Sequence, residues 1–76
     1  MPASSFRRGR AIVHEPSGQQ YIGLVEVCGR VVSIRGHVRI EALGQTGLEY
    51  RLGPEVDTTF VNRRLQVDWL PDSAAS

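Results

Sequence analysis

The chain has 76 residues, a formal net charge of +1 and one cysteine. This length allows one domain at most, and a lone cysteine excludes an internal disulfide. A folded unit of about 60 residues buries only about 60 % of the surface of its unfolded chain, so we expect self-association to supply further burial. No stretch approaches the roughly 18 apolar residues of a membrane span, and we expect a cytoplasmic protein with no membrane partner.

Polar and basic residues come first, and we expect residues 1–9 to form a flexible arm. A single domain then covers residues 10–70, beginning with a short strand at residues 11–14. Residues 15–18 read Glu-Pro-Ser-Gly, which favours a tight turn because Pro suits its first corner and Gly its last position. The next strand resumes near Gln20.

Residues 21–35 form one long apolar run, for which we expect a single extended strand. Strict alternation along this run would place Glu26 on the core face. A β-bulge at Cys28 and Gly29 shifts the alternation of inward and outward side chains by one residue, and this shift turns Glu26 outward. The bulge also collects four aliphatic side chains on the core face: Val25, Val27, Val32 and Ile34.

The same parity leaves three apolar side chains on the outward side: Ile22, Leu24 and Val31. A sheet that is covered on one face normally carries polar residues on the other. Either another part of the chain covers these side chains, or they form the contact surface for a partner. We take them as candidate interface residues of a two-fold homodimer.

Two further strands, at residues 37–42 and 48–52, follow a hairpin loop at residues 35–37 and flank a loop at residues 43–47. Both alternate cleanly between apolar and polar residues. Their inward positions are Val38, Ile40, Ala42, Leu48, Tyr50 and Leu52. We expect the register that places Arg39 opposite Glu49, because it avoids facing like charges.

Pro54 suits the first position of a helix, and we expect one short helical turn within residues 54–61. The last strand covers residues 64–70. Its inward side chains are Leu65, Val67 and Trp69, and residues 71–76 form a tail.

These elements predict an all-β domain, a small antiparallel barrel of five to six strands with one short helical turn before the last strand. The order resembles a Src-homology-type barrel, in which a short tight helix precedes the final strand. It also resembles an oligonucleotide/oligosaccharide-binding barrel, whose first strand is long and bent, as residues 21–35 are. Both resemblances rest on the order of elements and transfer no functional residues.

Side chains that often carry chemistry are scattered along the chain. Cys28 has no base near it in the sequence, so it is expected to be a small apolar residue and not a nucleophile. His14, Cys28 and His37 show no recognised metal-ligand spacing. We therefore predict no catalytic residue, no metal site and no cofactor.

Glu41 and Glu49 are the only paired-carboxylate candidate. The alternation puts both on the outward side of neighbouring strands. A ladder with Arg39 and Arg51 on a solvated face accounts for them without any catalytic role.

Two functions from different classes remain. The first is a non-enzymatic interaction module that self-associates and binds a protein partner through Ile22, Leu24 and Val31. The second is a nucleic-acid-binding barrel. Its candidate phosphate contacts are Arg7, Arg8, Arg10, Arg30, Arg35, Arg39 and Arg51. A contiguous positive surface would favour nucleic acid, whereas neutralised pairs beside an apolar patch would favour the interaction module.

Overall fold

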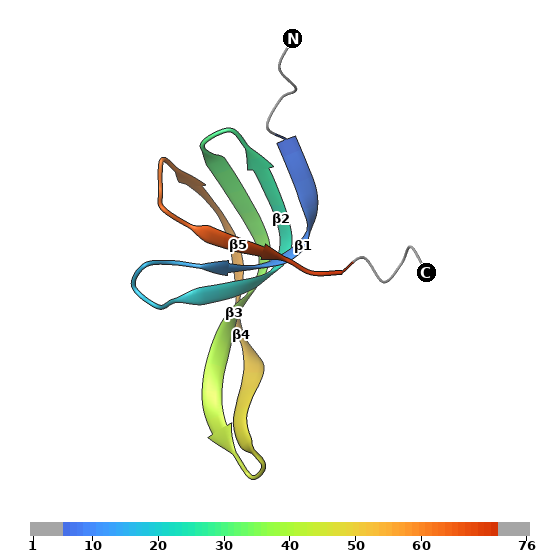
Figure 1. The fold of residues 1–76 in the computed structure, drawn as a ribbon, viewed down its shortest axis with the longest axis vertical. Coiled ribbons are helices and arrows are strands. Elements are labelled where there is room, and N and C mark those ends of the chain that lie inside the picture. Colours follow the sequence, from blue (N-terminus) through green and yellow to red (C-terminus); the bar gives the residue numbers. More distant parts are fainter. Residues whose placement is uncertain (1–5, 72–76) are drawn as a thin grey trace.

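The computed structural model describes residues 6–71, which form five strands and no helix. The strands are β1 (Phe6–His14), β2 (Gln20–Cys28), β3 (Val31–Gly44), β4 (Gly47–Val61) and β5 (Gln66–Trp69). They pair antiparallel in one sheet with the order β4-β3-β2-β1-β5 (Figure 1). The predicted all-β antiparallel class is confirmed. The sheet is open, because its edge strands β4 and β5 do not pair with each other.

Strand β1 begins earlier than its apolar residues suggested. Phe6 lies opposite Cys28 and Arg8 opposite Glu26, so residues 6–9 of the predicted arm belong to the sheet. The sequence of this segment is polar and does not indicate a strand, because the strand forms through its pairing with β2 and not through local propensity. Residues 1–5 of that arm and residues 72–76 of the predicted tail lie outside the described residues.

The turn after β1 has its predicted position. The backbone N–H of Gly18 donates to the carbonyl oxygen of Glu15 at 2.9 Å, which closes a four-residue turn. Strand β2 then starts at Gln20, as expected.

Strands β2 and β3 meet in a tight hairpin, and the predicted bulge in one long strand is wrong. Gly29 and Arg30 form a two-residue turn flanked by the partners Cys28 and Val31. Gly29 adopts the left-handed conformation, with φ of 60°, that glycine tolerates.

The predicted burial along β2 and β3 is nevertheless correct, because a hairpin turn changes the parity in the same sense as a bulge. Val25 lies opposite Ile34 and is fully buried with it. Val27 lies opposite Val32 and packs against the same core. Glu26 faces the other side, where its side chain is partly exposed.

The predicted hairpin loop at residues 35–37 does not form, and these residues lie inside β3. Gly36 instead pairs with Gly23 of β2. A Cβ atom at Gly36 would press against the carbonyl oxygen of Ile22, and one at Gly23 against that of Arg35. The pair therefore requires glycine in both strands, because the two backbones approach closely.

Residues 39–52 project from the sheet as a two-stranded hairpin (Figure 1). The pairing of β2 with β3 ends at Val38, so the far half of β3 has β4 as its one neighbour in the described chain. Gly44 and Gly47 close the tip around a two-residue turn.

The predicted register of this hairpin is wrong. Arg39 lies opposite Leu52, not Glu49, and Glu41 lies opposite Tyr50. The reason is the turn: two residues connect the strands in place of the expected five, which moves β4 by three positions relative to β3. An odd displacement also moves every side chain of this part of β4 to the face opposite the predicted one.

Strand β4 continues through the segment for which we predicted a helical turn. His37 pairs with Glu55 and Arg39 with Leu52, so Gly53 and Pro54 together face a single residue of β3 and form a bulge. Proline lacks an N–H and is tolerated at such a bulge on an edge strand. The β-branched residues that follow favour a strand over a helix.

The short connection between β4 and β5 forces the sheet to coil. In a flat sheet, Val61 and Gln66 would be separated by four strand spacings and by the length of β1, or about 33 Å. The connecting residues 62–65 reach at most about 18 Å. The sheet must therefore curl until β5 lies across its concave side.

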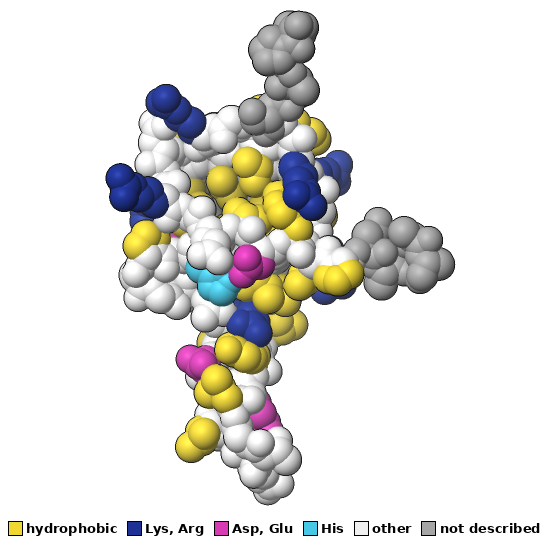
Figure 2. Space-filling model, viewed as in Figure 1, with side chains coloured by type: hydrophobic (Ala, Val, Ile, Leu, Met, Phe, Trp, Pro, Cys, Tyr) yellow, Lys and Arg dark blue, Asp and Glu magenta, His cyan; other side chains and the backbone are white. Residues whose placement is uncertain are grey.

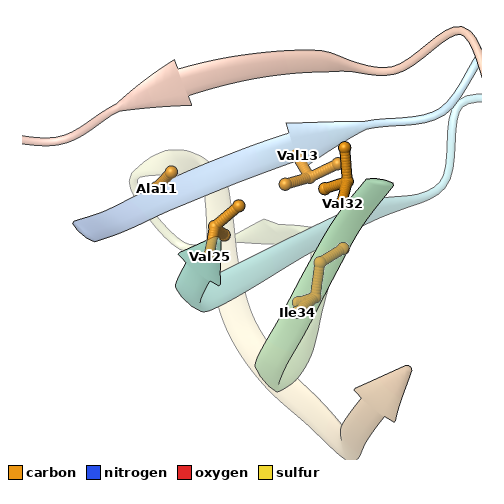
Figure 3. Close-up of a cluster of buried hydrophobic side chains, with 5 residues drawn as sticks. All are labelled: Ala11, Val13, Val25, Val32 and Ile34. Carbon is orange, nitrogen blue, oxygen red and sulfur yellow. The ribbon is translucent and has the colours of Figure 1, made fainter. Parts of the chain in front are cut away.

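The core lies inside this curl (Figure 3). Its buried side chains come from three neighbouring strands and are Ala11, Val13, Val25, Val32 and Ile34. Six partly buried side chains pack against them: Tyr21, Val27, Phe60, Leu65, Val67 and Trp69. The predicted inward positions of the last strand are thus confirmed.

A polar cluster fastens the β4–β5 connection to the turn after β1. The side chain of Glu15, only 11 % exposed, accepts hydrogen bonds from the Tyr21 hydroxyl and from Arg63 Nη2, the latter at 3.2 Å. The Tyr21 and Phe60 rings lie 5.9 Å apart beside it. Desolvation, together with the hydrogen bond and charge of Glu15, raises the pKa of Tyr21 to about 12, against the opposing charge of Arg63.

Candidate interaction surface

The convex side of the sheet, opposite the core, carries two of the three predicted interface residues near its centre. Ile22 lies directly opposite Ile12 of β1, which makes an apolar cross-strand pair. Leu24 lies between Arg10 of β1 and Arg35 of β3. The side chains of Ile12, Arg10 and Arg35 therefore lie on the same outer face as those of Ile22 and Leu24.

Ion pairs border Leu24. Arg8 Nε lies 3.3 Å from Glu26 Oε2, and Arg35 Nε lies 3.6 Å from Asp57 Oδ2. These four side chains and Leu24 line one shallow pocket. Leu24 is half-buried by its own chain, as Ile22 is.

Val31 stands apart from the other two predicted interface residues. It lies opposite Cys28 and Val61, at the end of the sheet next to the β2–β3 turn. Ile22 faces His37, six residues farther along β3, which corresponds to about 20 Å. The predicted trio does not form one patch.

A larger apolar surface lies on the projecting hairpin. It has four members on one side of the two strands: Leu43, Leu48, Tyr50 and Leu52. We call this set the tip face. Leu43 is 85 % exposed, Leu52 61 %, Leu48 59 % and Tyr50 44 %. Figure 2 shows apolar side chains reaching the surface along this projection.

Arg39 joins the tip face to the sheet. Its guanidinium carbon lies 3.3 Å from the centre of the Tyr50 ring, a cation–π contact, and its Nη1 donates to Gln20 Oε1 at 2.5 Å. Ile22, Tyr50 and Leu52 line a shallow pocket with this arginine. The tip face is therefore continuous with Ile22 and not with Leu24.

Three members of the tip face had been expected to point inward, and Leu43 to lie in a loop. The error follows from the register, which an alternating pattern cannot fix without the turn length. The informative signal was the spacing of Gly44 and Gly47, since two glycines separated by two residues are compatible with a two-residue hairpin turn.

Four of the seven arginines of the nucleic-acid hypothesis lie on the convex face, namely Arg8, Arg10, Arg35 and Arg39, and three of these four already have partners. Arg8 and Arg35 are paired with carboxylates, and Arg39 is engaged by Tyr50 and Gln20. Arg10 lies on the outer face of β1, Arg30 in the β2–β3 turn and Arg51 on the hairpin side opposite the tip face. On the side seen in Figure 2, cations occupy several separate places.

Arg7 has an unexpected position on the core side of β1. Its guanidinium carbon lies 4.4 Å from the centre of the Trp69 ring, so the cation caps the indole at the open end of the coil. Gly9 leaves room for the same ring, 3.7 Å from where its Cβ would lie. Arg7 was expected in a flexible arm, and it instead packs on Trp69 as part of the fold.

The chemistry-bearing side chains lie far apart in the sheet. His14 Nε2 and Asp68 Oδ2 are 2.8 Å apart at one end, Cys28 is exposed at the opposite end of β2, and His37 faces Glu55 in the middle. Within residues 6–71, no three histidine, cysteine or acidic side chains lie close enough to hold a metal ion.

Glu41 and Glu49 do not share a side of the hairpin, contrary to the alternation prediction. Glu41 faces Tyr50, whose hydroxyl donates to Glu41 Oε2 at 3.5 Å, whereas Glu49 faces Ala42 on the other side. The odd displacement of β4 separates them.

No family model matches this chain, and comparison with curated proteins and with solved structures finds no match either. The described part of the chain contains no helix with the length and apolarity needed to cross a membrane.

Proposed function

We propose that the protein is a non-enzymatic interaction module that binds protein partners, its own copy included, through the tip face and Ile22. One observation carries this proposal: four large apolar side chains are exposed on an element that adds nothing to the buried core. Contiguous exposed apolar surface typically marks an interaction site, because leaving it in water is unfavourable. A domain this small also gains stability from further burial.

The surroundings of the tip face support a protein partner over other ligands. Arg39 and Glu41 both contact Tyr50 on the tip face, and charged side chains beside apolar surface are the arrangement expected for the polar rim of an interface. The ion pairs Arg8–Glu26 and Arg35–Asp57 lie farther along the convex face, around Leu24. The coiled five-stranded sheet resembles small barrel-type interaction modules in outline, and this likeness is an analogy only. A reducing compartment suits the exposed free thiol of Cys28, so we propose a cytoplasmic location.

Nucleic-acid binding is the alternative, and it has weaker support because Arg8 and Arg35 are already paired. It predicts that an oligonucleotide binds with an affinity that falls steeply as salt concentration rises. The interaction module predicts no such binding. A titration with labelled single-stranded DNA at two salt concentrations discriminates between the two.

The double variant Leu48→Ser/Leu52→Ser tests the proposed surface. Burial of each leucine contributes about 1.5–3 kcal/mol, and about 1.4 kcal/mol is a tenfold change, so self-association should weaken at least about a hundredfold. Sedimentation equilibrium measures the change, and Leu24→Ser is the matched control. An unchanged association constant in the double variant would contradict the proposal.

A further inference from the structure

The edge of β4 at the hairpin is open to pairing. Within residues 6–71, β3 covers one side of residues 47–52 and no strand lies on the other. Backbone N–H and C=O groups of an antiparallel strand point alternately to its two neighbours. Every second residue here therefore presents unpaired groups outward, which makes a template for another strand.

Residues 47–53 of this edge form a self-complementary sequence, Gly-Leu-Glu-Tyr-Arg-Leu-Gly. Reversed, it keeps glycine, leucine and tyrosine at the same places and exchanges the two charges. Glu49 and Arg51 are equally distant from Tyr50, and so are Leu48 and Leu52.

We propose that a second copy of this chain pairs antiparallel along residues 47–53 about a two-fold axis at Tyr50. Leu48 then lies opposite Leu52 of the second copy, and Glu49 opposite Arg51 of the second copy. The inference rests on the proposed function and specifies its partner and geometry. Direct partners share a face, so the leucines and tyrosines of both copies gather on the tip face, and two ion pairs form on the other side.

Other registers fail on charge or on backbone geometry. A shift by two residues in one direction places Glu49 against its own copy, and in the other direction Arg51 against its own copy, which is repulsive. A shift by one residue joins outward backbone groups to groups that already face β3. It also sets Leu48 or Leu52 against a charged side chain. Among registers displaced by up to two residues, the one centred on Tyr50 alone satisfies both demands, and larger displacements leave fewer residues paired.

The pairing has a natural end on the far side. Pro54 offers no N–H, and the bulge that it forms with Gly53 interrupts the edge. Glu55 and Asp57 follow, and both are exposed. On the near side, the two-residue turn ends the strand. The Thr46 hydroxyl there donates an exposed hydrogen bond of 3.2 Å to the Glu49 carboxylate. Pairing with a second copy replaces this hydrogen bond by the ion pair between Glu49 and Arg51 of that copy.

Charge exchange tests the register. In a dimer of Glu49→Arg, or of Arg51→Glu, both ion pairs become like-charge contacts, and association should weaken at least about tenfold. The double variant Glu49→Arg/Arg51→Glu restores both pairs and should associate like the wild type. An equimolar mixture of the two single variants should form a heterodimer. Sedimentation equilibrium at low salt measures all four samples, with circular dichroism as the folding check.

A cross-link tests the axis independently of charge. Residue 50 is the one position in residues 47–53 that meets its own copy, so Tyr50→Cys in a Cys28→Ser background should form a disulfide-linked dimer on mild oxidation. Leu48→Cys in the same background should cross-link far more slowly.

The outcomes separate this inference from the proposed function. Restoration by the double charge variant and by mixing supports the pairing. Single and double charge variants that are equally weak, or equally tight, overturn it, as does a wild-type monomer at high micromolar concentration. The proposed surface is judged separately, by whether Leu48→Ser/Leu52→Ser changes association with any partner that the wild type binds.

Discussion

The coiled part of the sheet and the projecting hairpin use the same two strands for opposite purposes. In the coiled part of the sheet, β3 contributes Val32 and Ile34 to the core, and Phe60 of β4 packs against it together with Leu65 and Val67. Past the bulge, the same strands carry the tip face into solvent, and within residues 6–71 no third strand pairs with them. An isolated two-stranded hairpin is at best marginally stable in water. The coiled part of the sheet therefore supplies the stability, and the hairpin supplies the exposed apolar surface on which the proposed function rests.

Two features mark the border between these regions. On the core side, the Gly23–Gly36 pair brings the backbones of β2 and β3 together. On the edge, the bulge at Gly53 and Pro54 changes which side chains of β4 face outward. Because of that change, the apolar set of β4 switches from the concave side in the coil to the tip face in the hairpin.

The largest expected difference between the regions is in core truncation. Ile34→Ala should cost about 2–5 kcal/mol of unfolding free energy, because the side chain is fully buried and leaves a cavity. Leu43→Ala should stay within about 0.5 kcal/mol, since this side chain is almost fully exposed. Urea denaturation at low micromolar concentration measures both. Equal costs would show that the hairpin is as tightly packed as the coil.

The border itself should tolerate no side chain. Gly36→Ala places a Cβ within 2.7 Å of Gly23 Cα and against the Ile22 carbonyl, so we expect a loss of about 1–3 kcal/mol. Gly9→Ala is the matched control, because its Cβ would meet only Trp69 at ordinary contact distance. Thermal unfolding of the two variants gives the comparison, and a Gly36→Ala protein as stable as Gly9→Ala would contradict the close approach.

The cation on Trp69 should give a smaller effect within the coil. Arg7→Ala removes a partly exposed cation–π contact and should cost about 0.5–1 kcal/mol, whereas Arg30→Ala in the β2–β3 turn should cost less. Trp69 is the one tryptophan, so its fluorescence reports on this site directly. An emission spectrum unchanged by Arg7→Ala would mean that the guanidinium does not cover the indole.

The polar cluster of Glu15, Tyr21 and Arg63 should affect the pH dependence of stability only at alkaline pH. The pKa of Tyr21 is raised from 10.0 to about 12, so the fold favours the protonated phenol. Its contribution is fully present below pH 10 and is lost as pH rises through about 12. Tyr21→Phe should flatten the fall in stability over that interval. The pH dependence of stability measured by urea denaturation gives the comparison, and a fall over that interval that persists in full in Tyr21→Phe would refute the assignment.

The sequence allowed the coil to be predicted better than the hairpin. Burial of Val25 and Ile34 followed from alternation together with one break near Gly29, and the inward side chains of β5 followed from alternation alone. The turn at Gly29 was mistaken for a bulge because both devices change the parity by the same amount. Gly36 was mistaken for a turn because close approach to Gly23 depends on a pairing that no local pattern contains.

The hairpin was harder because its register depends on the length of the turn, which is two residues and not the expected five. Charge pairing within one chain favoured Arg39 opposite Glu49, yet Arg39 stacks on Tyr50. Strand β3 places the apolar residues Ala42 and Ile40 opposite Glu49 and Arg51, whereas the proposed second copy would give each of them a partner of opposite charge. The candidate surface was therefore found only in part, through Ile22.

Hydrogen exchange at two protein concentrations tests the division between coil and hairpin most directly. The account predicts that amides of residues 47–53 become more protected from low to high micromolar concentration, because their free edge pairs with a second copy. Amides of β1 and β2 in the coil should exchange at the same rate at both concentrations. Protection of residues 47–53 that does not depend on concentration would contradict the account.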